Sequence, residues 1–92
     1  MTEFAPKCPR LAPFARYRWD KIREQHQVVY PEGVLVLNAT GAEIVKRMDG
    51  RGLDELVRDL ETAFQHEDLR ADVLKFLQGL YDHGLLNRDD PA

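Results

Sequence analysis

Only a few side chains in this sequence are of the types that bind metals or act as nucleophiles. The chain has one cysteine, Cys8, and three histidines, His26, His66 and His83. A metal site needs ligands at short spacings such as Cys-x-x-Cys or His-x-x-x-His, and these four residues are scattered along the chain. A nucleophilic Cys–His pair would use Cys8, but this residue lies in a proline-rich stretch that predicts little regular structure. The sequence therefore predicts no metal site, no cofactor and no covalent catalysis.

Paired carboxylates could serve as a general acid and a general base, and two such pairs occur. Asp20 and Glu24 lie among three basic residues, so we expect solvated ion pairs there and not a proton donor. Asp89 and Asp90 fall at the C-terminal end of the sequence, where we expect a tail. No glycine-rich phosphate-binding motif is present. We predict that the chain is not an enzyme.

The charge is distributed unevenly along the chain, whose formal net charge is −3. Residues 1–30 carry six Lys/Arg against three Asp/Glu, and residues 31–92 carry seven against thirteen. A protein that binds duplex DNA normally shows a concentrated positive surface, including on the helix that enters the groove. The last predicted helix has a net negative charge, which argues against nucleic acid as a partner.

The length of 92 residues fits one small domain. No apolar run approaches the roughly 18 residues that span a bilayer, and the first ten residues have no hydrophobic signal core. Together with the single cysteine, this predicts a cytoplasmic protein with no membrane contact. Three prolines predict a flexible N-terminal arm over residues 1–15, followed by one domain over residues 16–88 and a tail over residues 89–92.

The first half of the predicted domain is rich in alternating and β-favouring residues. Three strands are expected, at about residues 16–19, 23–30 and 34–37. Trp19 is expected on the buried face of the first strand. Pro31 and Gly33 suit a type I turn, so the second and third strands should form a hairpin.

Three segments with helical periodicity follow the strands. In the first, Thr40 and Glu43 have the spacing of a capping box, and Gly50 is a candidate C-cap. The second carries one apolar stripe, formed by Leu53, Leu56, Val57, Leu60 and Phe64. The third should begin after Asp68 as N-cap and end at Gly84. This order predicts an α+β, winged-helix-like fold, with a three-stranded antiparallel sheet followed by three helices.

The third helix has an unusually wide apolar face. Its main stripe consists of Leu69, Val73, Phe76, Leu77 and Leu80. Leu74 and Tyr81 fall beside that stripe, at about 100° per residue. One side of the face could meet the core and another a sheet or a partner, or both sides could be covered within the domain.

Several short motifs identify a family that this sequence resembles. In chain order they are Arg18-Trp19-Asp20, Arg23-Glu24, Tyr30-Pro31-Glu32-Gly33, Leu37-Asn38-Ala39-Thr40-Gly41, Asp49-Gly50, Asp72-Val73 and Gly84-Leu85. Over residues 16–86 this pattern resembles the PqqD family, protein D of pyrroloquinoline quinone (PQQ) biosynthesis. One departure is Gly52, where the family usually has Thr at the start of the second helix. Glycine is a tolerable cap and costs only a few tenths of a kcal/mol.

The resemblance implies a peptide-recognition element. Members of the family would bind the leader of the precursor peptide PqqA as an added strand, in a groove shared with the third helix. They would then present the peptide to the radical S-adenosylmethionine (SAM) enzyme PqqE, which carries the chemistry. The segment 34–37 is short and uncharged, as a docking edge should be. The candidate peptide-binding residues are therefore Val34, Leu35, Val36, Leu37 and Asn38, with Asp72, Leu74 and Lys75 of the third helix.

Three alternatives stay open at this point. Residues 34–37 could form a central strand with both edges already paired. The N-terminal basic cluster could bind the anionic quinone product, which would make the protein a carrier in the same pathway; this cluster consists of Arg16, Arg18, Lys21 and Arg23. Finally, association or strand exchange could produce a homodimer, with or without peptide binding.

Overall fold

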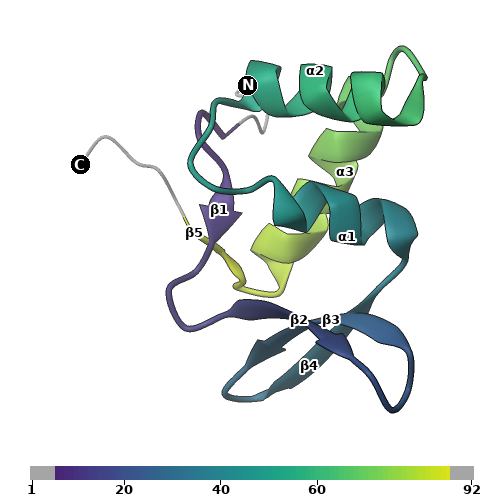
Figure 1. Cartoon of the computed structure of the whole chain (residues 1–92). Helices are drawn as coiled ribbons and strands as arrows, with labels where there is room; N and C mark the ends of the chain where they lie inside the picture. Colours follow the sequence, from purple (N-terminus) through teal and green to yellow (C-terminus); the bar gives the residue numbers. More distant parts are fainter. Residues whose placement is uncertain (1–5, 88–92) are drawn as a thin grey trace.

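The computed structural model describes residues 6–87, in which a small sheet lies below three helices (Figure 1). The elements are β1 Arg10–Leu11, β2 Arg16–Asp20, β3 Gln25–Tyr30, β4 Gly33–Leu37, α1 Ala39–Lys46, α2 Leu53–Phe64, α3 Arg70–Asp82 and β5 Leu86–Asn87. The predicted α+β, winged-helix-like fold is confirmed. The predicted C-terminal tail and the first five residues of the predicted arm lie outside the described residues. Within those residues, every helix is too short or too polar to cross a membrane.

The main sheet has the strand order β2-β3-β4 and is antiparallel throughout. β2 extends to Asp20, just beyond the predicted strand, whereas β3 begins only at Gln25. Asp20 accounts for this shift because its Oδ1 accepts hydrogen bonds from two backbone N–H groups of the intervening turn. At the other end of β3, Tyr30 pairs with Gly33 across the predicted hairpin turn.

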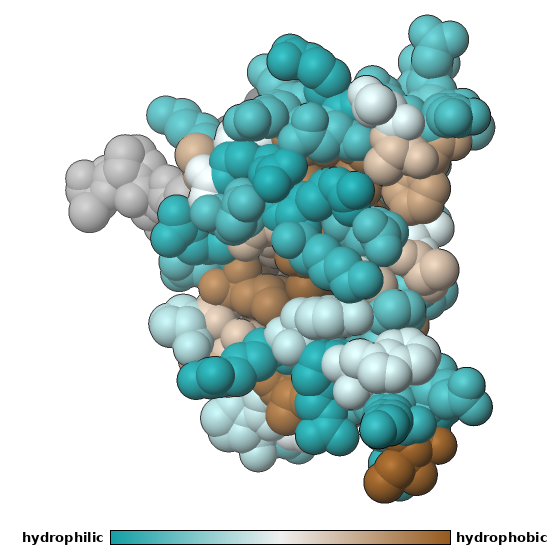
Figure 2. All heavy atoms as spheres, viewed as in Figure 1, coloured by the Kyte–Doolittle hydropathy of each residue, from teal (hydrophilic) through white to brown (hydrophobic). Residues whose placement is uncertain are grey.

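One face of the sheet packs against the helices and forms the core. Val28 of β3, opposite Leu35 of β4, points to this inner face and is fully buried. The largest fully buried side chains of the core cluster are Leu56, Leu60, Leu77, Leu80, Leu85, Val28 and Val73. Each such side chain contributes about 1.5–3 kcal/mol when it is buried. Figure 2 shows hydrophobic atoms in a hollow between the helices and the sheet, while the surface above is mostly hydrophilic.

Trp19 does not lie in the core, which corrects the prediction. Its side chain is 48% exposed, because it occupies the last inward-facing position of β2 before the turn, at the rim of the sheet. Its ring centroid lies 4.8 Å from that of His26. The Tyr17 hydroxyl is 2.7 Å from Nδ1 of the same histidine. The aromatic side chains therefore partly bury His26.

The N-terminus of α1 uses a different cap from the predicted one. Asn38 is the N-cap, and its Oδ1 accepts a hydrogen bond from the Gly41 N–H at 2.7 Å. Thr40 lies inside the helix, so the predicted capping box does not form. Asparagine ranks above threonine as an N-cap, which favours the earlier start. Glu43 is then available to pair with Arg47, one turn further on.

Two glycines adopt left-handed backbone conformations, but only one ends a helix. Gly50 has a φ of 102° and lies in the loop beyond the end of α1, so its prediction as C-cap is wrong. Gly84 has a φ of 73° directly after α3, as predicted. The Gly84 N–H donates to the Tyr81 carbonyl, and the Leu85 N–H donates to the Leu80 carbonyl. This turn directs the chain back to the core.

The N-terminus of α3 is capped from another helix. Asp68, the predicted N-cap, has a φ of 62° and lies one residue before the N-cap position, which Leu69 occupies. The Leu69 N–H donates instead to Oε2 of Glu61 in α2, at 3.1 Å. A carboxylate at this position also interacts favourably with the helix dipole. The prediction of Asp68 was wrong because a side chain from α2 occupies the capping position.

Residues 6–15, predicted to belong to a flexible arm, instead pack on the domain. β1 pairs antiparallel with β5, and the Ala12 N–H donates to the Leu85 carbonyl at 2.7 Å. The Lys7 carbonyl accepts a hydrogen bond from the N–H of Leu53, the first residue of α2, also at 2.7 Å. The N-cap of α2 is Gly52, which has no side chain to cap the helix. The N-terminal segment thus supplies a hydrogen-bond acceptor to the first N–H of α2, for which the local sequence has no side-chain cap.

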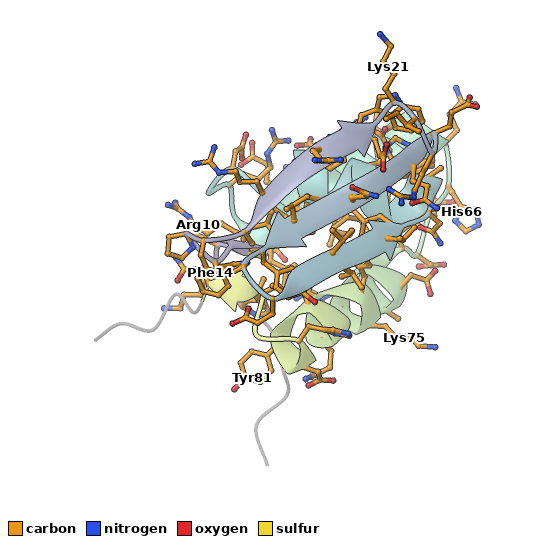
Figure 3. The ribbon with its side chains drawn as sticks, turned by 90° about the horizontal axis from the view of Figure 1, so that it is seen from below. Arg10, Phe14, Lys21, His66, Lys75 and Tyr81 are labelled. Atoms are coloured by element: carbon orange, nitrogen blue, oxygen red, sulfur yellow. The ribbon has the colours of Figure 1, made fainter. Side chains whose placement is uncertain are left out.

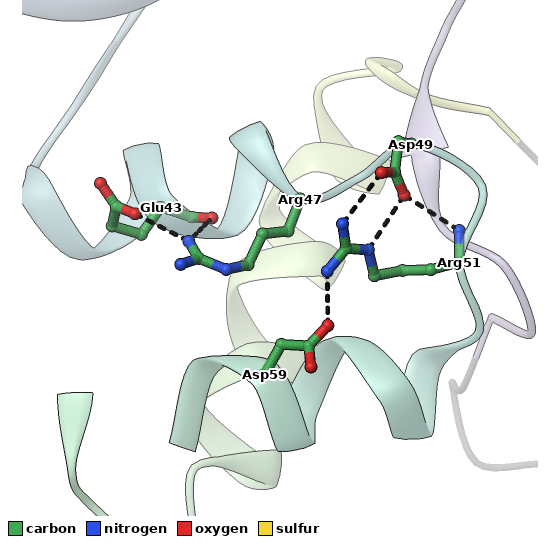
Figure 4. A network of polar contacts seen from close by, with 5 residues as sticks. All are labelled: Glu43, Arg47, Asp49, Arg51 and Asp59. Carbon is green, nitrogen blue, oxygen red and sulfur yellow. Dashed lines mark hydrogen bonds and ion pairs between the residues drawn. The ribbon is translucent and has the colours of Figure 1, made fainter. Parts of the chain in front are cut away.

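An ion-pair network links the α1–α2 loop to α2, and a separate ion pair joins Glu43 of α1 to Arg47 at its C-terminal end (Figure 4). Arg51 donates to both carboxylate oxygens of Asp49, at 3.0 and 2.9 Å, and also to Asp59 of α2. The hydrogen bonds from Arg51 lower the pKa of Asp49 to about 2. In α1, the hydrogen bond from Arg47 lowers the pKa of Glu43.

Replacing Asp49 by Asn should change how stability depends on pH. The pKa of Asp49 falls from its ordinary value of 3.8 to about 2 on folding. Such a carboxylate stabilises the folded state fully above its ordinary pKa, and this contribution is lost as the pH falls toward the folded-state pKa. We expect the wild type to lose stability more steeply than Asp49→Asn between about pH 4 and pH 2 in urea unfolding. Glu55→Gln, on the exposed face of α2, controls for the loss of one charge; equal slopes for Asp49→Asn and the wild type would contradict the expectation.

Supplying a side-chain cap to α2 should stabilise the protein. Gly52 has φ −66° and ψ 156°, which any residue can adopt, and an added Cβ would lie 3.9 Å from the Lys7 carbonyl oxygen. We expect Gly52→Ser to raise the unfolding free energy by about 0.5–1 kcal/mol, through the cap and through reduced freedom of the unfolded chain. For this size of domain, Tm should rise by about 2–8 °C in thermal denaturation. Gly52→Ala separates the two effects; if it stabilises as much as Ser, the hydroxyl does not cap the helix.

Candidate functional site

β4 lies at an edge of the main sheet. In the described part of the chain it pairs with β3 on one side only, so residues 34–37 do not form a central strand. Backbone groups alternate in direction along an antiparallel pair, and the residues that close a short hairpin turn bond to each other. Tyr30 and Gly33 close this turn, so the N–H and C=O groups of Val34 and Val36 point to the free edge. Such an edge can accept another strand.

A groove of about 260 Å³ runs between β4 and α3. The residues that line it are Leu35, Val36, Leu37, Asn38, Lys75, Phe76, Gly79, Leu80 and His83. Most of this lining is apolar, and Lys75 and His83 add polar groups on the side of α3. A strand paired with β4 would project every second side chain to the face on which this groove lies.

A second pocket, of about 250 Å³, adjoins the groove between the three helices. Its apolar lining comes mainly from Ile44, Leu60, Phe64, Leu69 and Val73. Asn38, Lys75 and Phe76 line both the groove and this pocket, so the two hollows adjoin each other at these residues. Together they offer apolar surface beside the edge strand and among the helices.

The structure brings most of the predicted residues to these hollows, but not all. Asp72 lines the second pocket, and Lys75 lines both hollows. Leu74 lies about 140° around α3 from Gly79 and packs against the core cluster, so it faces away from the groove. This edge of the wide helix face is covered within the domain, whereas Tyr81 is partly exposed. Figure 3 shows Lys75 and Tyr81 pointing in different directions from α3.

Four residues that line the groove were missed in the sequence, namely Phe76, Gly79, Leu80 and His83. A signal was present, because Lys75, Gly79 and His83 recur every four residues and form one stripe along α3. A glycine inside a helix often has a packing or functional reason, and here it leaves the groove open. Val34, which was predicted, lines a separate depression on the other face of the sheet.

The Asn38–Gly41 turn positions the ring of Phe76 between the two hollows. A Cβ added at Gly41 would lie 2.8 Å from Cε1 of Phe76 and 3.2 Å from Oδ1 of Asn38. The first distance is shorter than real carbon contacts, so only glycine admits both the ring and the cap. This gives a structural reason for the Asn-x-x-Gly spacing in the sequence.

The groove offers binding chemistry through its shape and its backbone groups. Among residues 6–87, no group of three His, Cys, Asp or Glu side chains is placed to hold a metal ion. The carboxylates whose pKa is lowered are Asp20, Glu43 and Asp49, and all three are held by arginines outside the two hollows. What the site provides is hydrogen bonding along an edge and burial of apolar side chains.

Two glycine substitutions should have opposite effects on stability. Gly41→Ala forces Phe76 or the Asn38 cap to move, and we expect it to lower the unfolding free energy by about 1–3 kcal/mol. At Gly79 nothing lies within 4 Å of an added Cβ. Gly79→Ala should therefore raise the unfolding free energy by about 0.5–1 kcal/mol, because alanine is the better helix former. Urea unfolding of both variants tests this, and effects of the same sign would contradict it.

Comparison with known proteins agrees with this geometry. The family described as coenzyme PQQ synthesis protein D (PqqD) matches residues 25–86. A relative from Methylococcus capsulatus, named PqqA binding protein, is 31% identical over 75 residues, which is 80% of this chain and 81% of the relative. A protein of the same name from Azotobacter vinelandii is 35% identical over 72 residues, covering 76% of this chain and 78% of the relative.

A solved structure shares the fold. It is the solution NMR structure of the PqqD truncation of Methylobacterium extorquens PqqCD, described as a stand-alone recognition element for ribosomally synthesized and post-translationally modified peptides. The match has a TM-score of 0.74 at 30% identity and covers 87% of this chain and 88% of that one. Sequence motifs, fold and relatives agree, and the chain belongs to the PqqD family.

Proposed function

We propose that this protein binds the precursor peptide PqqA as an additional strand on β4. The observation that carries the proposal is the free edge of β4 beside the groove formed with α3. Relatives at 31% and 35% identity bear the name PqqA binding protein, which supports the identity of the peptide. Main-chain bonds would supply affinity, and the groove would select side chains.

The geometry suggests how the peptide would lie. Its backbone would bond to the outward N–H and C=O groups of Val34 and Val36. Alternate side chains would enter the apolar groove beside Phe76 and Gly79, and one could extend into the second pocket. Lys75 and His83 would contact polar groups at the margin of the groove. Leu74, originally a candidate, has no part in this arrangement because it packs against the core.

The protein would then present the bound peptide to the radical SAM enzyme PqqE. In this role it holds the substrate, and the redox chemistry belongs to the enzyme, so we propose that the chain itself is not catalytic. A cytoplasmic location, expected from the single cysteine, stays a prediction. A second copy of the chain could pair with the same edge, so dimerisation through β4 would compete with the peptide.

The geometry favours the peptide over the quinone product as a ligand. Quinone binding was considered because of the basic cluster near the N-terminus. Arg18 and Arg23 of this cluster line a depression on the other face of the sheet and do not line the groove beside β4. The quinone serves best as a control ligand when peptide binding is measured.

Isothermal titration with synthetic PqqA tests the proposal directly. We expect binding that disappears when the leader is deleted from the peptide. Absence of binding by a protein that circular dichroism shows to be folded, both alone and with PqqE present, would refute the proposal.

Filling the groove should block the peptide without unfolding the protein. Gly79→Leu places a branched side chain in the groove, starting from a Cβ that meets nothing within 4 Å. We expect peptide affinity to fall at least about tenfold, or 1.4 kcal/mol, while stability stays at or above that of the wild type. Gly79→Ala is the matched control and should bind nearly as well as the wild type. Unchanged affinity for Gly79→Leu would show that the peptide binds elsewhere.

A further inference from the structure

The outer face of the main sheet is the surface that points away from the helices, and Figure 3 looks onto it. Paired residues share a face of a sheet, which assigns to this one Arg16, Arg18, Asp20, Gln25, Gln27, Val29, Val34 and Val36. Val34 and Val36 are 48% and 56% exposed. The face therefore combines an apolar edge on β4 with arginines on β2.

Gln27, in the middle of this face, has a buried oxygen without a partner. The residue is only 4% exposed, and its Oε1 accepts no hydrogen bond. The orientation of the amide is fixed, because Nε2 donates to Asp20 at 3.1 Å and to the side-chain oxygen of Gln25 at 3.3 Å. If the Gln27 amide were rotated by 180°, its oxygen would lie against the side-chain oxygens of Asp20 and Gln25, which are both acceptors in this arrangement. This oxygen is one of the few unpaired buried polar atoms that a folded protein carries.

The same place on the sheet is hollowed and carries two cations. A depression of about 360 Å³ is lined by Arg18, Asp20, Arg23, Gln25 and Gln27, together with Val34 and Val36 of the edge strand. Both arginine side chains are more than half exposed, although each also contacts Asp20. A guanidinium has five N–H donors, so each arginine keeps donors for a further acceptor.

The charge of this surface differs from that of the rest of the chain. The basic residues of the first 30 positions include Arg16, Arg18, Lys21 and Arg23, which all lie in β2 and the turn after it. Residues 31–92 carry thirteen Asp/Glu against seven Lys/Arg. An acidic partner would be attracted to the outer face and repelled by much of the remaining surface.

We propose that the outer face of the β2-β3-β4 sheet docks the modifying enzyme, through an acidic segment that meets Arg18 and Arg23. This inference rests on the proposed function and names the surface that the enzyme would use. Val34 and Val36 form the apolar centre of the contact, with the arginines at its rim. Apolar contacts surrounded by charged groups are common at protein interfaces.

The enzyme and the peptide would then bind to two sides of one strand. The groove beside α3 takes the peptide, and Val34 does not line it. The outer depression takes the enzyme, and Val34 does line it. A peptide strand on the edge of β4 would lie against both the groove and the outer depression, which places the substrate next to the docked enzyme.

The test measures the affinity of purified PqqE and of PqqA separately for four forms of the full chain. These are the wild type, Arg18→Glu, Arg23→Gln and the control Arg58→Glu, which reverses a charge on the exposed face of α2. Arg23→Gln removes a charge but keeps an amide donor for Asp20, so it guards against misfolding of Arg18→Glu. We expect both outer-face variants to bind PqqE at least tenfold more weakly and PqqA within twofold of the wild type. PqqE binding by the wild type should also weaken as NaCl is raised from 50 to 300 mM, because the contact is between charges.

The outcomes separate this inference from the proposed function. Unchanged PqqE affinity for both outer-face variants, or an equal loss with Arg58→Glu, would overturn the docking surface. A wild type that binds PqqA but not PqqE would overturn it as well, and would leave peptide recognition standing. Conversely, PqqE binding that depends on Arg18 and Arg23 without any PqqA binding would support the surface and refute peptide recognition.

Discussion

The structure depends on one core in which the side chains of all three helices close over a single face of a three-stranded sheet. Leu56 and Leu60 of α2 and Leu77 and Leu80 of α3 are fully buried in the same cluster as Val28 of the central strand. In a chain of 92 residues this core is the main source of stability. Because only one face of the sheet is buried, the other face and the edge strand β4 are left available for partners.

At its helix ends, this small domain pairs backbone N–H groups with hydrogen-bond acceptors from distant parts of the chain. The local sequence offers no side-chain cap at the start of α2 or of α3. The Lys7 carbonyl bonds to the first N–H of α2, and Glu61 of α2 bonds to the N-cap N–H of α3. These contacts hold the N-terminal segment and the helix pair in place, and with them the position of α3 beside β4. The width of the groove therefore depends on residues that do not line it.

The sequence predicted the edge strand better than the helix face that lines the groove. β-strand periodicity and turn chemistry are local and predicted a strand at residues 34–37, and the family resemblance predicted that this uncharged strand is a docking edge. On α3 the same approach chose Leu74 and passed over Phe76 and Gly79. A wide apolar face contains both core and groove positions, and hydrophobicity alone cannot distinguish them. The distinction comes from where β4 and α1 lie, which local sequence does not encode.

By itself, the sequence determined the order of strands and helices, the α+β class and the family, because each depends on patterns within a few turns of chain. It also determined that Gly84 would end α3, since a left-handed position after a helix selects glycine. Only the tertiary structure decided that residues 6–15 join the domain and that Trp19 lies at the rim of the sheet. It alone placed Gln27 with an unpaired buried oxygen on the outer face. These features depend on contacts between residues far apart in the chain, where burial and hydrogen-bond partners are set by packing and not by local propensity.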